Sequence, residues 1–370
     1  MKKALVHDWY YVNGGAEKVI HSINNIWSDF DHFALVDFLN AADRDFILKG
    51  QKVNTSFIQK LPTAKSNHRK FLQFFPYAVE QFDLRAYDLI LSSSASIAKG
   101  VLTNQNQLHI CYCHSPMRYA WDLYHQYLED ANLTKGLKAI YAKYVLGKMR
   151  QWDITSLNRV DEFIANSNFI AKRIKKVYNR DATVIYPPVD VETFTLDVNK
   201  EDYFFTASRM VPYKKIKLIV KAFNDMPNKK LVVSGDGPEF NEIKKIAKSN
   251  ITLLGFTSKE ELKTHLQKAK AFVFAAEEDF GILPVEAQAC GTPVIAYGKG
   301  GLLETVIDQE TGLFFYEQSI MAIKDAIKRF ERLNLDHKLI SKHASKFSKQ
   351  RFQEEMQQFI IKKYTEFKER

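Results

Sequence analysis

The stretch AEEDFGILPVEAQACGTPVIA, residues 276–296, decides how this chain folds. It follows the apolar run AFVFA at residues 271–275 and ends in a second apolar segment. Such a pattern predicts a strand, a loop, a helix, a turn and another strand. Pro284 is tolerated in the first turn of a helix and Gly291 suits the end of one, so we expect the helix to cover about residues 282–290.

The start of this helix suits an anion. The first amides of a helix have no internal acceptor and lie at the positive end of its dipole, so Gly281, Ile282 and Leu283 offer donors to a phosphate. Glu278 in the loop and Glu286 on the second turn can accept hydrogen bonds from hydroxyl groups. Spaced glutamates alone favour an acidic loop before an ordinary strand–helix unit. Beside a phosphate site they indicate a ligand with a sugar at each end of a diphosphate, and a nucleotide sugar fits.

The complete string resembles the signature of a known enzyme family. Two glutamates separated by seven residues, with FGI between them and a helix running into GTPVIA, are similar to the retaining glycosyltransferases of family four (glycosyl transferases group 1). The resemblance implies an α/β protein with the GT-B fold, in which two Rossmann-like, doubly wound domains face a central cleft. It further implies that a C-terminal helix, at about residues 352–370, crosses back to the first domain. The resemblance covers nearly the whole chain and is strongest over residues 208–306.

The paired prolines Pro187 and Pro188 predict the boundary between the two domains. Adjacent prolines stop regular structure, and a similar Y-P-P-V-D string precedes the hinge in the resembled family. We expect an N-terminal, acceptor-binding domain at residues 1–187, completed by the C-terminal helix, and a C-terminal, nucleotide-sugar-binding domain at residues 188–351. A length of 370 residues also suits two domains better than one.

The composition limits the partners and the compartment. Lysine and arginine outnumber the acidic residues by 53 to 43, an excess that suits anionic nucleotides, nucleic acid or an anionic membrane surface. No RNA-binding motif accompanies the basic residues, which disfavours a nucleic-acid partner. Three cysteines give no disulfide framework, and no secretion signal or apolar run of about 20 residues is evident. We expect a cytoplasmic protein whose membrane attachment, at the inner face of the cytoplasmic membrane, would be peripheral.

The amino-terminal half alternates strands with helices. Strand-like stretches at residues 3–8, 32–38, 87–92, 108–113 and 161–166 predict a parallel, doubly wound sheet. Ligands of such sheets bind at the carboxyl ends of the strands, where His7, Asp8, the serines at 92–94 and His114 fall.

A second string, HSPMRYAWD at residues 114–122, resembles the corresponding segment of bacterial GDP-mannose-dependent mannosyltransferases that build surface polysaccharides such as O-antigen. Spacing alone favours a loop histidine without a catalytic role. The resemblance implies that His114 approaches the transferred sugar and assigns Arg118 and Asp122 to the acceptor side. It also implies that Gly14 and Gly15, in the loop after the first strand, border the donor diphosphate.

The carboxy-terminal half contains RMVPYK at residues 209–214, which matches the family pattern R-x-V-P-x-K. Its Arg209 and Lys214 would neutralise the leaving diphosphate. The catalytic residues that the resemblance implies are His114, Arg209, Lys214 and Glu278. The donor-binding residues are Gly14, Gly15, Arg209, Lys214, Gly235, Phe256, Glu278, Phe280, Gly281, Ile282, Leu283 and Glu286, with Glu278 at the sugar, Glu286 at the ribose and Phe256 beside the base.

The function that follows is transfer of mannose from GDP-mannose to a glycan or lipid-linked acceptor, with the anomeric configuration retained. Family members are described as reacting on the front face of the donor, with the departing phosphate helping to deprotonate the acceptor. Two alternatives stay open: a UDP-sugar-dependent enzyme of the same fold, and a non-catalytic subunit that binds nucleotide sugars.

We expect neither an essential metal nor a cofactor beyond the nucleotide-sugar co-substrate. The letters D-x-D, which hold a divalent ion in many other glycosyltransferases, occur at Asp29–Asp31 and Asp43–Asp45, where they precede or open helical segments. His109, Cys111 and Cys113 alternate onto one strand face, but structural zinc usually has four ligands. These three residues are expected in the core.

Segments 65–82 and 133–152 mix basic and aromatic residues. In the second, Leu137, Ile140, Tyr141, Tyr144 and Val145 recur at helical spacing with lysines on the flanks. This pattern usually means a helix with its apolar side in the core and charge in solvent. The alternative is a helix on a membrane surface, near a lipid-linked acceptor.

Overall fold

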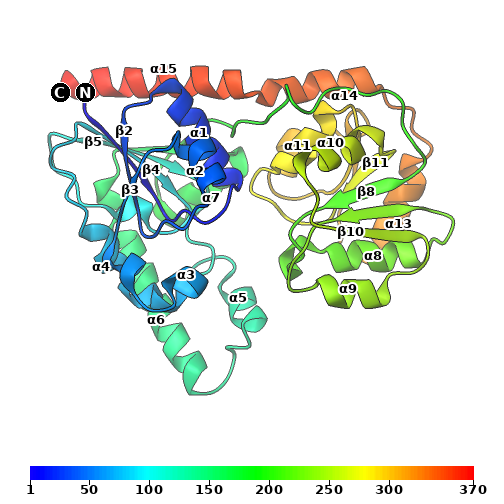
Figure 1. Cartoon of the computed structure of the whole chain (residues 1–370), viewed down its shortest axis with the longest axis horizontal. Helices are drawn as coiled ribbons and strands as arrows, with labels where there is room; N and C mark the ends of the chain where they lie inside the picture. Colours follow the sequence, from blue (N-terminus) through cyan, green and yellow to red (C-terminus); the bar gives the residue numbers. More distant parts are fainter. The chain divides into compact units, whose positions relative to one another are not determined.

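The computed structural model describes residues 1–370. The chain divides into two compact units. Unit 1 comprises Met1–Pro188 together with Phe352–Arg370, and unit 2 comprises Val189–Arg351. Each unit is built around one parallel β-sheet with helices on both faces (Figure 1).

Unit 1 contains a seven-stranded sheet in the order β3-β2-β1-β4-β5-β6-β7. Its strands are β1 (Lys3–His7), β2 (Phe30–Ala34), β3 (Val53–Thr55), β4 (Leu89–Ser94), β5 (Leu108–Cys113), β6 (Glu162–Ala165) and β7 (Thr183–Val184). Its helices are α1 (Gly15–Ile26), α2 (Ala41–Leu48), η1 (Phe57–Lys60), α3 (Ala64–Asn67), η2 (His68–Phe74), α4 (Phe75–Glu80), η3 (Ala98–Gly100), α5 (Tyr124–Asp130), α6 (Leu137–Thr155), η4 (Leu157–Arg159), α7 (Asn168–Tyr178) and most of α15 (Lys349–Lys368).

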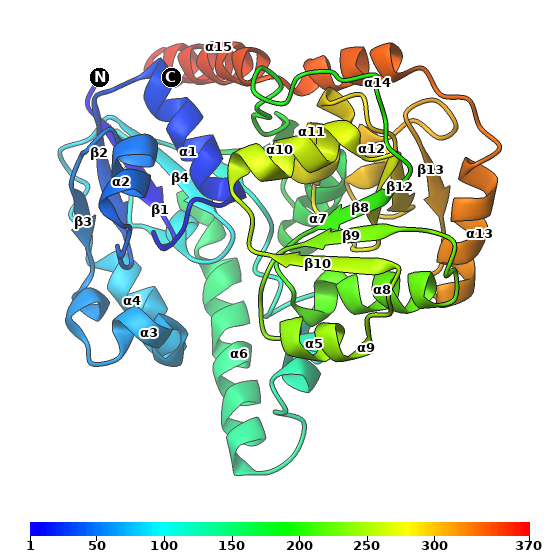
Figure 2. The same cartoon turned by 45° about the vertical axis from the view of Figure 1, so that its right-hand side comes forward.

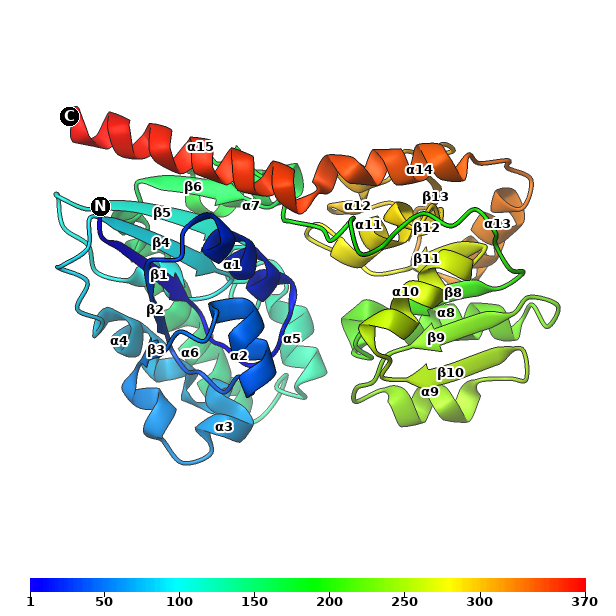
Figure 3. The same cartoon turned by 45° about the horizontal axis from the view of Figure 1, so that its top comes forward.

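Successive residues of the unit 1 strands point into different core layers. Leu5 on β1 packs in the layer that contains α1 and α15, whereas its neighbours Ala4 and Val6 pack in the layer that contains α4 and α6. Because side chains alternate along a strand, a sheet covered on both faces needs apolar residues at nearly every position. The three central residues of β1, Ala4, Leu5 and Val6, meet this requirement, and Figure 3 shows α1 and α15 lying along one side of the sheet.

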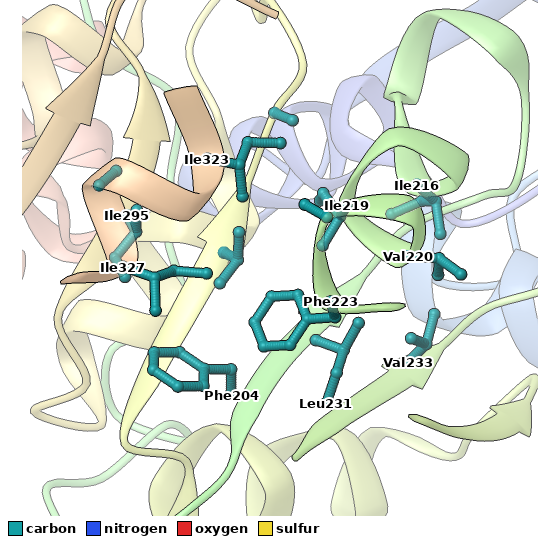
Figure 4. Close-up of a cluster of buried hydrophobic side chains, with 14 of the residues drawn as sticks. Phe204, Ile216, Ile219, Val220, Phe223, Leu231, Val233, Ile295, Ile323 and Ile327 are labelled. Atoms are coloured by element: carbon teal, nitrogen blue, oxygen red, sulfur yellow. The ribbon is translucent and has the colours of Figure 1, made fainter. Parts of the chain in front are cut away.

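Unit 2 contains a six-stranded sheet in the order β10-β9-β8-β11-β12-β13. Its strands are β8 (Phe204–Ala207), β9 (Leu231–Ser234), β10 (Ile251–Gly255), β11 (Ala271–Phe274), β12 (Val294–Tyr297) and β13 (Gly312–Phe315). Its helices are η5 (Pro212–Lys214), α8 (Ile216–Asn224), α9 (Phe240–Ile246), α10 (Lys259–Lys268), α11 (Ile282–Ala289), α12 (Leu302–Thr305), α13 (Ile320–Phe330), α14 (His337–Ala344) and η6 (Ser345–Phe347). One core layer joins Phe204 on β8 with Phe223 on α8 and Ile327 on α13 (Figure 4).

Most strands lie where the apolar runs predict them, and residues 108–113 are reproduced at both ends. The predicted strand at residues 32–38 is misplaced. The observed β2 covers Phe30–Ala34, because beyond Ala34 the chain leaves the ladder and the Leu35 amide bonds the Asp8 carbonyl. The placement of Asp29–Asp31 before a helix is therefore wrong, since Asp31 lies inside β2.

The carboxy-terminal helix completes the core of unit 1. Phe352, Met356 and Ile360 on α15 are buried beside residues of α1, β5 and β6, which confirms the predicted return of residues 352–370 to the first domain. The Lys363 ammonium lies 2.9 Å from the Glu162 carboxylate and adds an ion pair to this contact.

The core interpretation of the apolar stripe on α6 is wrong. Leu137, Ile140, Tyr141 and Tyr144 are exposed, and only Val145 of the five residues is buried. The helix packs on the unit 1 core through its opposite side and its later turns. None of the helices is both long and apolar enough to span a lipid bilayer.

The burial of α15 predicts unequal effects for two adjacent isoleucines. Ile360→Ala should lower the free energy of unfolding of unit 1 by about 2–4 kcal/mol, because it leaves a cavity in the core. Ile361 is 51% exposed, so Ile361→Ala should change it by about 0.5 kcal/mol or less. Urea denaturation followed by tryptophan fluorescence measures this, since all four tryptophans lie in unit 1. Equal effects of the two substitutions would contradict the packing of α15.

Candidate active site

The unit 2 site lies where the strand order reverses, between β8 and β11. Parallel sheets bind ligands outside the carboxyl ends of the strands at such a point. The loop after β8 leads to Lys214 at the end of η5, and the loop after β11 carries Glu278. The Lys214 ammonium forms an ion pair with the Glu278 carboxylate, and both side chains are partly buried. This pair joins the two loops across the reversal.

Arg209 lies in the same loop as Lys214, exposed and without an ion-pair partner. The loop is held in place by its neighbours at the backbone. Gly235, with φ of 127°, lies so close that a Cβ atom there would be 1.9 Å from the Ser208 carbonyl oxygen. The Gly235 amide in turn donates to the Gly255 carbonyl at 2.7 Å. Only glycine fits this position, so the close packing of three loops explains its presence.

The Glu278 loop rests on a second glycine-rich turn. The Gly301 amide donates to the Glu278 carbonyl at 2.8 Å. At Gly300, where φ is 74°, a Cβ atom would lie 2.4 Å from the same oxygen. Sequence reasoning missed the role of this turn in positioning Glu278. The signal was the adjacent pair Gly300 and Gly301, which begins three residues beyond the end of the apolar strand β12.

Helix α11 begins where the sequence predicts. Gly281 precedes it in a left-handed conformation, with φ of 90°, and Ile282 and Leu283 supply its first amides. Glu286 lies on the second turn and is buried. The ring of Phe280 also turns inward, with its centroid 5.5 Å from that of Phe347, so the structure shows it supporting the loop from the core side.

An exposed aromatic ring stands at the carboxyl end of β10. Phe256 is 86% exposed. The next residue is fixed, because the Thr257 and Ser234 hydroxyls hydrogen bond at 2.6 Å. The Phe256 ring is therefore anchored next to Gly255 with its face open to solvent. A flat ligand group could stack on this face.

Unit 1 has its own reversal, between β1 and β4. Here Asp8, which is buried, accepts hydrogen bonds from three backbone amides of the segment after β4. These amides belong to Ala95, Ile97 and Ala98, at 2.6, 2.8 and 2.8 Å. A carboxylate that satisfies three amides fixes the path of that segment, and with it the position of Ser93 just before it.

His114 follows β5 and reaches back to this reversal. Its Nε2 lies 2.8 Å from the Ser93 hydroxyl, and its amide donates to the Ser94 carbonyl at 2.8 Å. Burial lowers the pKa of His114 to about 3, and the positive charges of His7 and Arg118 act in the same direction. The imidazole is thus neutral at physiological pH and can exchange hydrogen bonds but carries no charge.

His7 lies beside Ser93 with both ring nitrogens facing acceptors. Nδ1 is 3.0 Å from the Ser93 carbonyl and Nε2 is 3.4 Å from the Glu17 carboxylate. Burial lowers the pKa of His7, but the hydrogen bond and charge of Glu17 outweigh it and the pKa is raised. Glu17 also accepts the Gly14 amide at 3.1 Å, linking the glycine loop to the histidines. Sequence reasoning missed Glu17, although a glutamate three residues after a helix cap is a known signal.

The structure shows a partner for Asp122 on helix α7. The Asp122 carboxylate is 2.8 Å from the Arg173 guanidinium, which ties the segment after His114 to α7. Arg173 also donates to the Ser115 hydroxyl at 3.1 Å. Arg118 is partly buried and lies near enough to His114 for its charge to affect the pKa there.

The residues that invited a metal interpretation have other partners. The two ring nitrogens of His109 lie 2.8 Å from the Ser92 hydroxyl and 2.7 Å from the Arg159 carbonyl. Cys111 and Cys113 are buried, which confirms the core prediction. Asp29 pairs with Lys3 at 2.5 Å.

The His7–Glu17 contact predicts a pH-dependent effect of Glu17→Gln. A histidine whose pKa is raised on folding contributes stability below its unfolded pKa, and this contribution is lost as pH rises through the folded pKa. The loss of unfolding free energy in Glu17→Gln should therefore be largest near about pH 5.5 and shrink toward about pH 9. Urea denaturation by tryptophan fluorescence at several pH values measures it, with the exposed Glu129→Gln as control. A difference that grows toward alkaline pH would refute the contact.

Curated relatives match part of this chain. An uncharacterised glycosyltransferase of Methanocaldococcus jannaschii is 31% identical over 197 residues, which are 51% of this chain and 55% of that protein. The D-inositol 3-phosphate glycosyltransferase of Mycobacteroides abscessus is 28% identical over 184 residues, 42% of this chain and 41% of that protein. The matched stretch thus spans about half the length of these relatives.

Solved structures share the fold over nearly the whole chain. The Anabaena protein HepE in complex with UDP has a TM-score of 0.67 at 17% identity, covering 98% of this chain and 100% of that chain. The apo lipopolysaccharide outer core galactosyltransferase WaaB has a TM-score of 0.67 at 16% identity, with the same coverage of 98% and 100%. At this identity the likeness shows the GT-B fold, as predicted.

Two family models divide the chain between them. The model described as Glycosyltransferase Family 4 matches residues 13–193. The model described as Glycosyl transferases group 1 matches residues 192–350. On these adjoining matches and the shared fold, the chain belongs to the group 1 glycosyltransferases of the GT-B fold.

Proposed function

We propose that this protein transfers a sugar from a nucleoside diphosphate sugar to an acceptor hydroxyl, with the anomeric configuration retained. The observation that carries the proposal is the Lys214–Glu278 ion pair across the strand reversal of unit 2. Exposed Arg209 lies in the same loop as Lys214, and the amino end of α11 follows Glu278 by a few residues. Positive charge, free amides and a carboxylate are thus gathered at one sheet edge.

Each part of a nucleotide sugar has a partner at this edge in the proposal. The diphosphate takes Arg209, Lys214 and the first amides of α11. The hydroxyls of the transferred sugar take Glu278, and the ribose takes Glu286. The exposed Phe256 ring stacks on the base.

The chemical difficulty is the separation of charge. An acceptor oxygen bonds to the anomeric carbon while the bond from that carbon to the phosphate oxygen breaks. The bonding pair leaves with the nucleoside diphosphate, and the acceptor proton passes to a departing phosphate oxygen. The leaving group gains negative charge, which Arg209 and Lys214 stabilise. Glu278 and Glu286 act as hydroxyl acceptors in this scheme, not as a glycosidase acid and nucleophile.

We further propose GDP-mannose as the donor and a glycan or lipid-linked glycan as the acceptor. Support comes from the HSPMRYAWD string and from the EEDFGILPVEAQACG string around Glu278. A UDP-sugar is the second candidate, because structures similar to this one contain UDP and UDP-glucose. The retained Arg209, Lys214, Glu278 and Glu286 favour an active enzyme over a non-catalytic subunit.

Calorimetric titration of the metal-free protein with GDP, UDP, ADP and GDP-mannose tests the donor site. We expect GDP compounds to bind most tightly, and Glu286→Ala to weaken binding by roughly 10-fold to 100-fold, as expected for one lost charged hydrogen bond. Glu310→Ala, an exposed glutamate of the same unit, should leave the affinity unchanged. Preference for UDP would overturn the mannose assignment and keep the chemistry, whereas no nucleotide binding would refute the function.

Removal of either cation should slow turnover. Arg209→Ala and Lys214→Ala should each raise the barrier by on the order of 3 kcal/mol, or roughly 100-fold in rate, because the leaving diphosphate loses a charge partner. Lys215→Asn is the matched control, since Lys215 is adjacent and asparagine tolerates its left-handed backbone. Nucleoside diphosphate release from GDP-mannose and from UDP-glucose, measured in chelator, gives the rates. Equal losses at Lys214 and Lys215 would contradict the assignment, and activity that requires added divalent ion would contradict the metal-free mechanism.

A further inference from the structure

Helix α6 is apolar on two sides, and only one of them has a protein neighbour. Its inner side buries Val145, Leu146 and Met149. The opposite side carries the outer stripe, defined as Leu137, Ile140, Tyr141 and Tyr144, which are 85%, 65%, 57% and 62% exposed. The first turns of α6, which carry this stripe, extend beyond the sheet of unit 1 (Figures 1 and 2).

The charges of α6 are arranged around the outer stripe. At 100° per residue, Lys138 and Lys143 lie on either side of the stripe and Lys148 continues it one turn later. All three lysines are exposed. Asp153, the one acidic residue of the helix, is fully buried and lies 2.8 Å from the Lys99 ammonium. The exposed part of α6 therefore carries positive charge alone.

A neighbouring segment has the same character. Helices η2 and α4 share a core layer with α6 through Phe75, Val145 and Met149. Phe74, Tyr77 and Lys70 on this segment are exposed, as is Lys65 on the preceding helix α3. The mixture of exposed aromatic rings and exposed lysines thus continues from α6 onto the adjoining surface of unit 1.

We propose that the outer stripe of α6 docks on the surface of an anionic lipid bilayer, with Leu137 and Ile140 inserted among the acyl chains. Large exposed apolar patches mark interaction surfaces. A helix with apolar side chains flanked by lysines suits the boundary between headgroups and acyl chains, where tyrosine also partitions. The lysines match the negative charge of anionic headgroups. A lipid surface is favoured over a protein partner because the exposed part of α6 has no acidic group to pair with a partner's cations.

The proposed membrane docking does not depend on which nucleotide sugar the protein uses, so it is tested without a nucleotide sugar present. The purified chain is sedimented with vesicles of phosphatidylglycerol and phosphatidylcholine, and with vesicles of phosphatidylcholine alone. We expect binding to the anionic vesicles that weakens as salt is added, because exposed charges are screened. Ile140→Glu/Tyr144→Glu should reduce binding by roughly tenfold or more, since two apolar side chains lose their insertion.

Matched variants separate the stripe from general charge and hydrophobicity. Met321→Glu alters an exposed apolar residue of α13 and should bind as wild type does. Lys138→Gln/Lys148→Gln should weaken binding to anionic vesicles, whereas Lys244→Gln/Lys245→Gln on α9 removes the same charge and should not. Circular dichroism confirms that each variant is folded.

Three results would overturn the proposal. The first is no binding to anionic vesicles at low salt. The second is an equal loss of binding in Ile140→Glu/Tyr144→Glu and in Met321→Glu. The third is a concentration-dependent dimer that dissociates in Ile140→Glu/Tyr144→Glu, with no vesicle binding by the wild-type chain. The last result would assign the stripe to a second copy of the chain. Nucleotide binding by the same preparations reports on the proposed function separately, so either proposal can fail alone.

Discussion

The reversal of strand order in each sheet is the constraint on which the rest of this structure depends. Both sheets begin with one strand, add two on one side and then cross to place the fourth strand on the other side. At that point the loops that follow two neighbouring strands run in opposite directions. Space for a ligand remains between them at the carboxyl ends of the strands. In unit 2 the Lys214–Glu278 pair occupies this position, and in unit 1 it is Asp8 with His7 and Ser93. Each reversal thus holds a group of interacting polar side chains.

The two reversals are stabilised in different ways. In unit 1 a buried carboxylate satisfies three amides, and a histidine–glutamate contact extends to the glycine loop, so the polar atoms are largely occupied by one another. In unit 2 the loops are fixed by backbone contacts at glycines, Lys214 and Glu278 are only partly buried, and Arg209 is exposed. A site that binds a charged, changing ligand benefits from a rigid backbone with side chains that can change partners. The unit 2 arrangement meets this description more closely.

Much of the fold could be predicted from the sequence because a parallel sheet covered on both faces needs continuous apolar runs. Such a run identifies β5 at both ends, residues 108–113. The edge strands β3 and β7 have three and two residues, too few to show a period. Periodicity also fails on α6, since it shows that a helix has an apolar side but not whether anything covers it. Lys214 and Glu278, both assigned to the donor site from sequence, lie together in an ion pair. The inward ring of Phe280 and the link through Glu17 depend on contacts that no local pattern encodes.

The return of α15 to unit 1 has a consequence for synthesis of the chain. The apolar sides of α1, β5 and β6 are made early, yet the side chains that cover them, Met356 and Ile360, leave the ribosome only after all of unit 2 has been made. Unit 2 is continuous in sequence and can complete its core first, whereas unit 1 must wait with an open apolar face. A nascent chain interrupted anywhere before residue 352 would carry that face uncovered. Unit 1 can therefore complete its core only after the whole of unit 2 has been translated. An incomplete chain exposes the apolar side of α1, β5 and β6, the kind of surface that chaperones and proteases recognise.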